Sequence, residues 1–161
     1  MQDQSLIIRA VEQLRAYAPS GFAMAFHIRF TTATFLFQTY PKDWSHVYSQ
    51  NGYVMQDPTV MWGFTDVGHK RWSELAKDDA AGMIAKAAEH GMRFGFTLAG
   101  DRDGSRSIAS FTRNDRDFTD AEITEIAQIF DKLQDVTLNL GDLAPETHEA
   151  LHKMSVEYTH P

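Results

Sequence analysis

The first third of the chain switches from a helical pattern of apolar residues to a strand pattern. Apolar residues near the start recur at helical spacing, at Leu6, Ile7, Ala10, Val11 and Leu14. The segment "FAMAFHIRF" then alternates, with Phe22, Met24, Phe26, Ile28 and Phe30 on one face, which is the period of a half-buried strand. The β-rich segment "ATFLFQT" follows after two threonines. These two segments predict a β-hairpin.

Three further helices are predicted in the middle of the chain. Pro41 suits the first turn of a helix over 41–51, which the dipeptide "NG" ends. Asp57 and Pro58 read as the N-cap and first residue of a short helix. The good helix formers over 73–90 predict one continuous helix, with Ser73 as its cap and Gly91 as its stop.

The last third predicts a second hairpin and a long helix. The segments "RFGFTLAG" and "RSIASFTRN" flank the turn sequence "DRDG". Thr119 and Glu122 then form a capping-box pattern ahead of a helix over 119–141 with an apolar stripe. The order of elements predicts an α/β (α+β) fold, in which an antiparallel sheet of about five strands is sandwiched between helices. The long helix is also a candidate dimer surface.

Composition and charge restrict the kinds of partner. The 161 residues suit one domain of ordinary size with a real core. A net charge of -7, with basic residues scattered among 22 acids, makes the chain alone a poor binder of nucleic acid. There is no cysteine, no signal-peptide pattern and no apolar run of membrane-spanning length. We therefore expect a soluble, cytoplasmic protein.

Three polar-tipped aromatic residues recur every four positions, at Tyr40, Trp44 and Tyr48, and Asp57 follows them. One interpretation is plain core packing beside an exposed helix cap. Buried tyrosine and tryptophan tips need hydrogen-bond partners, however, and three on one stripe exceed what an ordinary core requires. Together with Trp72 the set offers several donors, one anionic acceptor and a flat ring. That chemistry suits a small ligand with carbonyls, one amide N–H and an apolar remainder.

The spacing of these residues resembles a known family. The pattern Tyr40-x3-Trp44-x3-Tyr48-x8-Asp57-Pro58-x13-Trp72 is similar to that of the autoinducer-binding domain of LuxR-type quorum-sensing regulators. The element order extends the resemblance over about 5–141, with "GFTL" and "SIASF" as weaker matches. The resemblance implies a transcription-regulator domain that is not an enzyme, uses no cofactor or metal, and binds an N-acyl-homoserine lactone between its sheet and the helices on one side.

The resemblance also implies a role for each site residue. Trp44 would donate to the lactone carbonyl, Tyr40 would donate to the amide carbonyl, and Asp57 would accept from the amide N–H. Trp72 would wall the lactone ring, and Tyr48 would pack along the start of the acyl chain. Further ligand contacts are expected from Pro58, Thr59 and Ser110. Candidates for the acyl-chain lining are Phe26, Phe35 and Phe37.

The family pattern differs from this chain at two places. Ala99 stands where the family usually has a proline after the Gly-x-Thr strand, which concerns the following turn and not the polar site. We expect an autoinducer-binding domain over 1–141. Residues 142–161 resemble only the start of the helix-turn-helix domain that normally follows. The expected partners are a second copy in a homodimer or a full-length regulator in a heterodimer, and DNA only through a domain that this sequence does not contain.

Several other functions stay open from the sequence alone. The chain could be a headless partner that sequesters a full-length regulator, or a sensor of a non-lactone molecule. A metal site has little support, because only His148 and His152 among the seven histidines have the i, i+4 spacing of metal ligands. A lactone-hydrolysing enzyme would need a metal or an activated nucleophile, and neither is visible.

Overall fold

The computed structural model describes residues 2–30 and 32–138, and the expected tail over 142–161 lies outside them. One antiparallel sheet has the strand order β2-β1-β5-β4-β3. Its strands are β1 (Gly21–Arg29), β2 (Thr32–Gln38), β3 (Gly68–Arg71), β4 (Phe94–Arg102) and β5 (Ser105–Arg113). The expected five-stranded antiparallel sheet is confirmed.

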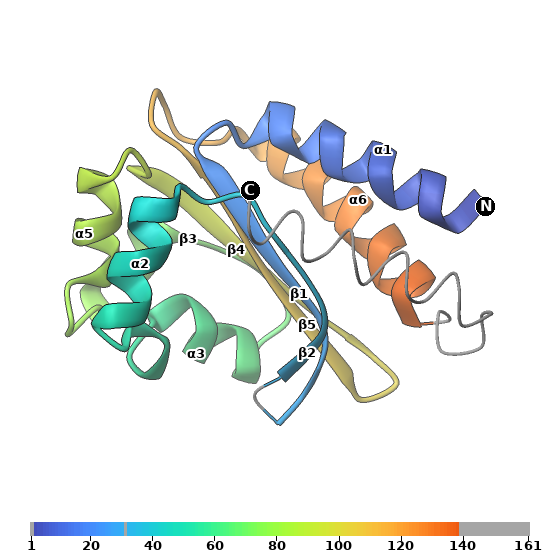
Figure 1. Cartoon of the computed structure of the whole chain (residues 1–161), viewed down its shortest axis with the longest axis horizontal. Coiled ribbons are helices and arrows are strands. Elements are labelled where there is room, and N and C mark those ends of the chain that lie inside the picture. Colours follow the sequence, from blue (N-terminus) through green and yellow to red (C-terminus); the bar gives the residue numbers. More distant parts are fainter. Residues whose placement is uncertain (1, 31, 139–161) are drawn as a thin grey trace.

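Helices cover both faces of the sheet (Figure 1). The long helices α1 (Gln2–Tyr17) and α6 (Asp120–Leu138) lie on one face. The other face carries the segment between β2 and β4. Its elements are α2 (Lys42–Gln50), the 3-10 turn η1 (Tyr53–Met55), α3 (Pro58–Thr65), α4 (Trp72–Leu75), the 3-10 turn η2 (Ala76–Asp78) and α5 (Met83–Glu89). None of the helices in the described ranges is long and apolar enough to cross a bilayer.

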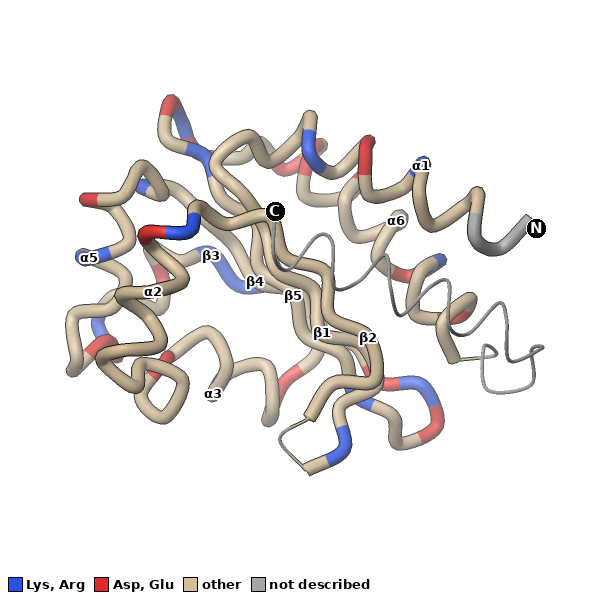
Figure 2. Tube along the Cα trace, viewed as in Figure 1, with Lys and Arg blue, Asp and Glu red and all other residues tan. Residues whose placement is uncertain are grey.

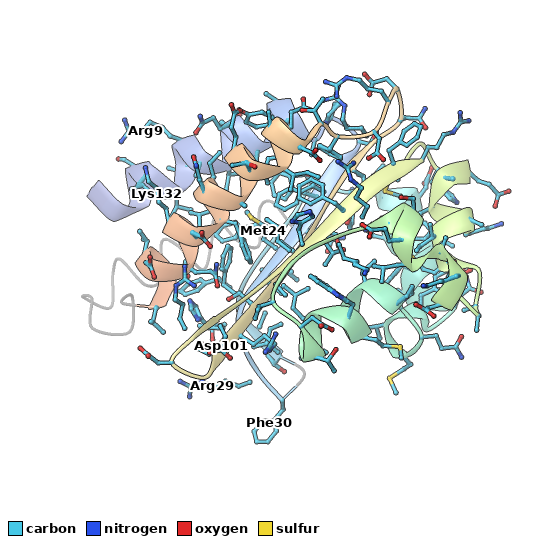
Figure 3. All side chains as sticks on the ribbon, turned by 180° about the vertical axis from the view of Figure 1, so that it is seen from behind. Arg9, Met24, Arg29, Phe30, Asp101 and Lys132 are labelled. Atoms are coloured by element: carbon cyan, nitrogen blue, oxygen red, sulfur yellow. The ribbon has the colours of Figure 1, made fainter. Side chains whose placement is uncertain are left out.

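The two faces of the sheet differ in side-chain size. Large residues of β1, β2, β4 and β5 pack with α1 and α6 in the main core; among them are Phe22, Met24, Phe26, Phe35, Phe37, Phe96 and Phe111. Figure 3 shows Met24 on this side and Phe30 projecting from the tip of the β1–β2 hairpin. Because neighbours along a strand point to opposite faces, the other face carries mostly small residues, together with the larger Leu36 and Ile108; the small ones are Ala23, Ala25, Gly95, Thr97, Ala99 and Ser110.

This division places the phenylalanines that were expected to line the acyl chain away from helices α2–α5. Phe26, Phe35 and Phe37 are each at most 2% exposed and belong to the core beneath α1 and α6. They therefore lie on the face opposite to α2–α5, and they cannot line a ligand held there. The alternation of β1 was recognised in the sequence, but the alternation alone does not say which face meets which helices.

The expected helix over 73–90 is wrong as a single element. The chain instead forms α4, the turn η2 and α5. The break comes from Gly82, whose φ of 74° lies in the left-handed region, and from Asp79, whose carboxylate accepts from the backbone N–H groups of Met83 and Ile84 at 2.9 and 2.8 Å. Strand β3 precedes α4, and its sequence "GHKR" has no apolar residue that would have indicated a strand.

Local signals at element ends were read correctly in three places. Asp57 caps α3 and Pro58 is its first residue. Thr119 and Glu122 form the expected capping box, with reciprocal bonds of 2.9 and 3.1 Å. The β4–β5 hairpin turns at Asp103-Gly104, where both residues have positive φ, as a two-residue hairpin turn of this kind requires.

His27 marks a bulge in β1 and joins the sheet to the end of α6. Its φ is 54°, and the register with β5 shifts between Ala25 and Ile28. The imidazole is 5% exposed, with Nε2 at 3.0 Å from the Gln134 carbonyl and Nδ1 at 2.6 Å from Ser105 Oγ. Burial lowers the pKa of His27, and Arg102 and Arg29 add to this effect while the Gln134 carbonyl opposes it.

The stability contributed by His27 should depend on pH. Because the folded pKa lies below the unfolded value of about 6.5, the unfolded chain binds the proton more readily, and stability is lost as pH falls below that value. His27→Gln should therefore cost more stability at pH 7.5 than at pH 5.5. Urea unfolding of both proteins at the two pH values measures this difference, with the exposed His46→Gln as control. An equal cost at both pH values would contradict the expectation.

Candidate ligand-binding site

The aromatic residues identified in the sequence gather on the α2–α5 side of the sheet. Trp44 on α2 is 2% exposed, and its ring contacts Tyr48 and Tyr53 with centroids 6.0 and 6.1 Å apart. His90 approaches the same indole at 5.5 Å. Tyr40 packs against this cluster but precedes α2, so it is held by the link from β2 and does not share a helix face with the other two.

Asp57 is the electrostatic centre of the site. It is 4% exposed, and its position at the start of α3 points its carboxylate toward α2. Oδ1 accepts from the backbone N–H and the hydroxyl of Thr59, at 2.8 and 2.6 Å. Oδ2 accepts from the Tyr48 hydroxyl at 2.8 Å. Three donors therefore compensate a carboxylate that would otherwise be costly to bury.

Burial acts on the protonation of all three acidic groups here. It raises the pKa of Asp57, while the hydrogen bonds from Thr59 and Tyr48 pull that pKa down again. Burial also raises the pKa of Tyr40 and of Tyr48 above the ordinary tyrosine value, and the neighbouring Asp57 carboxylate adds to both shifts. Both tyrosines therefore remain hydroxyl donors at neutral pH.

Trp72 lies directly on the sheet because Gly95 leaves room for it. A Cβ at Gly95 would come within 2.6 Å of the Trp72 ring, so only glycine permits this approach. The Trp72 indole N–H donates to Thr97 Oγ1 at 3.2 Å, and Thr97 is bonded to Ser110 at 2.7 Å. Trp72, Thr97 and Ser110 thus form a buried polar chain across β4 and β5.

Two donors among the site residues predicted from the sequence have no hydrogen-bond partner among the residues that the structure describes. They are the hydroxyl of Tyr40 and the indole N–H of Trp44, whereas Tyr48, Asp57, Thr59, Trp72 and Ser110 are each bonded to a neighbour. The arrangement therefore has two donors to spare, beside a carboxylate whose Oδ2 retains a free lone pair.

The structure brings the eight expected residues into one region and adds some that the sequence did not single out. Thr97, Tyr53 and His90 complete the polar chain and the aromatic cluster. Thr97 was within reach of the sequence, because it lies two residues after Gly95 on the same strand face. In the described ranges no group of three or more His, Asp or Glu residues is placed to hold a metal ion.

The amino-acid sequence matches a known protein family and a curated relative. Residues 12–137 match the model of the autoinducer binding domain. The transcriptional activator protein SolR of Ralstonia solanacearum is 27% identical over 96 residues, which is 59% of this chain but 41% of SolR. The chain thus matches well under half the length of that relative.

Solved structures share the fold. CepR2 of Burkholderia cenocepacia, described as an N-acylhomoserine lactone dependent LuxR family transcription factor, superimposes with a TM-score of 0.59 at 16% identity, covering 84% of this chain and 93% of that one. SdiA in complex with octanoyl-rac-glycerol gives a TM-score of 0.65 at 18% identity, covering 86% of this chain and 60% of that one.

Proposed function

Because the chain belongs to the autoinducer-binding domain family of LuxR-type regulators, we propose that it senses an N-acyl-homoserine lactone. The ligand would be held between the small-residue face of the sheet and helices α2–α5. The family is the ligand-binding part of transcriptional regulators and is not a family of enzymes. Binding would be read out through folding and dimerisation.

The observation that carries the proposal is the match between spare hydrogen-bonding groups and ligand chemistry. An acyl-homoserine lactone has a ring carbonyl, an amide carbonyl and one amide N–H. The spare donors of Trp44 and Tyr40 suit the two carbonyls, and the free lone pair of Asp57 suits the N–H. Trp72 would pack against the lactone ring, and Tyr48 would pack along the start of the acyl chain. Pro58, Thr59 and Ser110 shape the surroundings.

The small residues on the sheet support the same assignment. Ala23, Ala25 and Ala99 put short side chains on this face, beside the larger Leu36 and Ile108, and we assign the acyl chain to the space above them; the opposite face is packed with phenylalanine. Filling this space would bury apolar surface and satisfy the spare donors at once. A ligand that binds only the folded chain stabilises it by mass action, which gives the sensor its readout.

A second ligand class is an acylglycerol. It is favoured by the likeness in fold to SdiA, whose structure holds octanoyl-rac-glycerol. An acylglycerol offers one ester carbonyl and two hydroxyls, so Asp57 could accept from a hydroxyl where the lactone offers an N–H. Both ligands share an apolar chain and a compact polar head. They differ in the group facing Asp57.

Mass spectrometry of ligand retained by the purified protein tests the proposal. The chain is expressed with a panel of acyl-homoserine lactones and octanoyl-glycerol, purified, and then denatured to release what it holds. Recovery of one intact acyl-lactone in near-equimolar amount would support the lactone proposal and give its chain length. Recovery of octanoyl-glycerol alone would favour the second class. Equal yield of folded protein with nothing retained would refute both.

Replacing Trp44 by phenylalanine should weaken lactone binding selectively. The phenyl ring keeps most of the contacts with Tyr48 and Tyr53 but lacks the spare N–H donor. We expect a loss of about 1–1.5 kcal/mol in binding free energy, the usual contribution of a neutral hydrogen bond. Titration calorimetry measures it, with Trp62→Phe on α3 as the matched control. The same loss in both variants would contradict a specific role for Trp44.

A further inference from the structure

The C-terminal end of helix α3 is fixed to the sheet by an arginine of β5. Arg106 donates through Nη1 to the carbonyl oxygens of Gly63 and Asp66, at 2.8 and 2.6 Å. The last carbonyls of a helix have no partner within the helix, so a guanidinium placed there stabilises the helix end. The side chain of Arg106 is only 22% exposed, and its Nη2 lies 3.8 Å from the carboxylate of Asp101. The end of α3 is therefore held over the start of β5.

A second arginine of the same hairpin holds a different helix. Arg102 donates to Asp135 of α6 at 2.7 Å, so its side chain lies on the opposite face of the sheet. Figure 2 shows charged positions of both signs at the tip of the β4–β5 hairpin, whereas α3 is uncharged between its ends. The two arginines are therefore comparable in position, but only Arg106 acts on the side of the ligand site.

Close packing anchors α3 at the same place. A Cβ at Gly63 would come within 2.7 Å of the Ile108 side chain, so only glycine permits this approach. Ile108 is 7% exposed, and Ala99 beside it on β4 is 6% exposed. Because α3 touches Ile108 directly, no further methyl group fits between the helix and the sheet at this point.

This contact lies immediately beyond the polar part of the site. Ser110 belongs to the buried polar chain with Thr97, and Ile108 is the next residue of β5 on the same face. The step from Ser110 to Ile108 is about 7 Å, roughly the length of a six-carbon chain. An acyl chain that runs from the polar site along β5 therefore meets Ile108, with α3 seated on it, after this distance.

We propose that Ile108 and Arg106 restrict the site to short acyl chains, of about four to six carbons. Ile108 determines the specificity because it stands in the way of the chain. Arg106 is a positioning residue, since it keeps α3 in contact with Ile108 and does not itself touch the ligand. The restriction rests on the proposed function, because it concerns the acyl chain of the ligand bound there.

The remaining direction for a longer chain is sideways over β1. Ala25 pairs with Ile108 in register and is only half-buried. Carbon atoms that turn this way stay partly in contact with water, so they contribute little of the affinity that full burial provides. Longer chains should therefore bind about as tightly as a six-carbon chain, and not more tightly.

Calorimetric titration with butanoyl-, hexanoyl-, octanoyl- and decanoyl-homoserine lactone tests the restriction. Each fully buried methylene raises affinity about fourfold, so hexanoyl-lactone should bind roughly 15 times more tightly than butanoyl-lactone. From hexanoyl to decanoyl the affinity should change less than about twofold, because the added methylenes are not fully buried. An affinity that keeps rising about fourfold per methylene up to decanoyl would overturn the proposal.

Variants of the two residues should move the length limit. Ile108→Ala should make octanoyl-lactone bind about tenfold more tightly than hexanoyl-lactone, because it opens the way for two more buried methylenes. Arg106→Gln should raise the same ratio by a smaller factor, since α3 can then lift from the sheet. The matched control is Arg102→Gln, whose side chain is 29% exposed, and it should leave the ratio unchanged.

The ratio of the two affinities distinguishes specificity from a merely structural role. A structural role would lower the affinity for all chain lengths by the same factor and leave the ratio as it is, which would overturn the proposal. Thermal unfolding shows whether each variant is folded. If Ile108→Ala does not fold, Ile108→Val and Arg106→Gln decide the question through the same ratio.

A parallel series of monoacylglycerols separates this proposal from lactone sensing. The restriction acts on the acyl chain and not on the polar head, so acylglycerols should show the same limit. If only acylglycerols bind and their affinity stops rising at about six carbons, lactone sensing fails and the restriction stands. If lactones bind with an affinity that rises up to decanoyl, lactone sensing stands and the restriction fails. If neither series binds, both are refuted.

Discussion

Replacing Asp57 by asparagine should weaken binding of an acyl-homoserine lactone by about 10- to 150-fold, which is about 1.4–3 kcal/mol. The substitution keeps the shape of the side chain and removes its charge. The expected loss is large because Asp57 provides the only acceptor that we assign to the ligand's amide N–H. An N–H that is buried without an acceptor costs its full desolvation penalty.

The hydrogen bonds of the ligand-free site survive the same substitution. The asparagine oxygen can accept from the N–H and hydroxyl of Thr59, as Oδ1 of Asp57 does. Its NH2 group can donate to the Tyr48 oxygen, which reverses the present bond without breaking it. The difference appears only with ligand, because this NH2 then faces the ligand's N–H, and two donors repel each other.

The stability of the ligand-free chain should stay equal or rise in Asp57→Asn. Burial raises the folded pKa of Asp57, so the folded state binds this proton more tightly than the unfolded state does. Stability from such a group is present at low pH and is lost as pH rises from about 3.9, the unfolded value, through the folded pKa. Keeping Asp57 ionised in the folded state is therefore a net cost, and asparagine removes this cost while remaining a good N-cap.

Calorimetric titration and urea unfolding at pH 7 measure the two effects separately. Asp43→Asn, an exposed acid in the first turn of α2, controls for the loss of one negative charge. We expect it to change neither quantity by more than a few tenths of a kcal/mol. Unchanged lactone affinity in Asp57→Asn would refute the assigned role of this carboxylate, whatever the ligand proves to be.

The site could be predicted from the sequence where its residues are close together along the chain. Tyr48, Asp57 and Thr59 lie within one short segment, and the cap at Asp57 places them in contact. The chain of bonds from Trp72 to Ser110 joins residues 38 positions apart, and it depends on the register of β4 with β5. No local pattern contains that register, so the bond between Thr97 and Ser110 was not predicted.

The fold could be predicted where the local signal and the tertiary environment agree. The capping box at Thr119 and the Asp103-Gly104 turn fix their backbones by themselves. Strand β3 is different, because it is a polar edge strand whose strand partner is β4 and whose Arg71 is tied to Phe118 and Asp120. The helical composition of 73–90 was likewise overruled by the single cap at Asp79, which starts a new helix.

Phe26 lies on the face of the sheet that carries the large side chains, and it is the second position where we expect a large effect, here on the free energy of unfolding. Its ring is fully buried and contacts Phe37 and Phe130, with centroids 6.2 and 5.5 Å apart. Phe26→Ala should cost about 3–5 kcal/mol of unfolding free energy, because it removes a large apolar group and leaves a cavity beneath α6. Against a typical total of about 5–15 kcal/mol, such a loss brings the domain close to unfolding.

The same variant separates the two faces of the sheet as ligand-binding surfaces. If the ligand lies on the α2–α5 side, Phe26→Ala should leave the intrinsic lactone affinity of the folded molecules unchanged, because its ring points to the opposite face. Ala25 is the neighbouring residue and lies on the ligand side, so Ala25→Leu should do the reverse. It should lower the affinity for long acyl chains while changing stability far less.

Titrating both variants with lactones of several acyl-chain lengths, at a temperature where each variant is folded, measures the contrast. The opposite result would be a loss of affinity that grows with acyl length in Phe26→Ala and no loss in Ala25→Leu. It would place the ligand's acyl chain among the phenylalanines under α1 and α6, and those helices would have to open for the ligand.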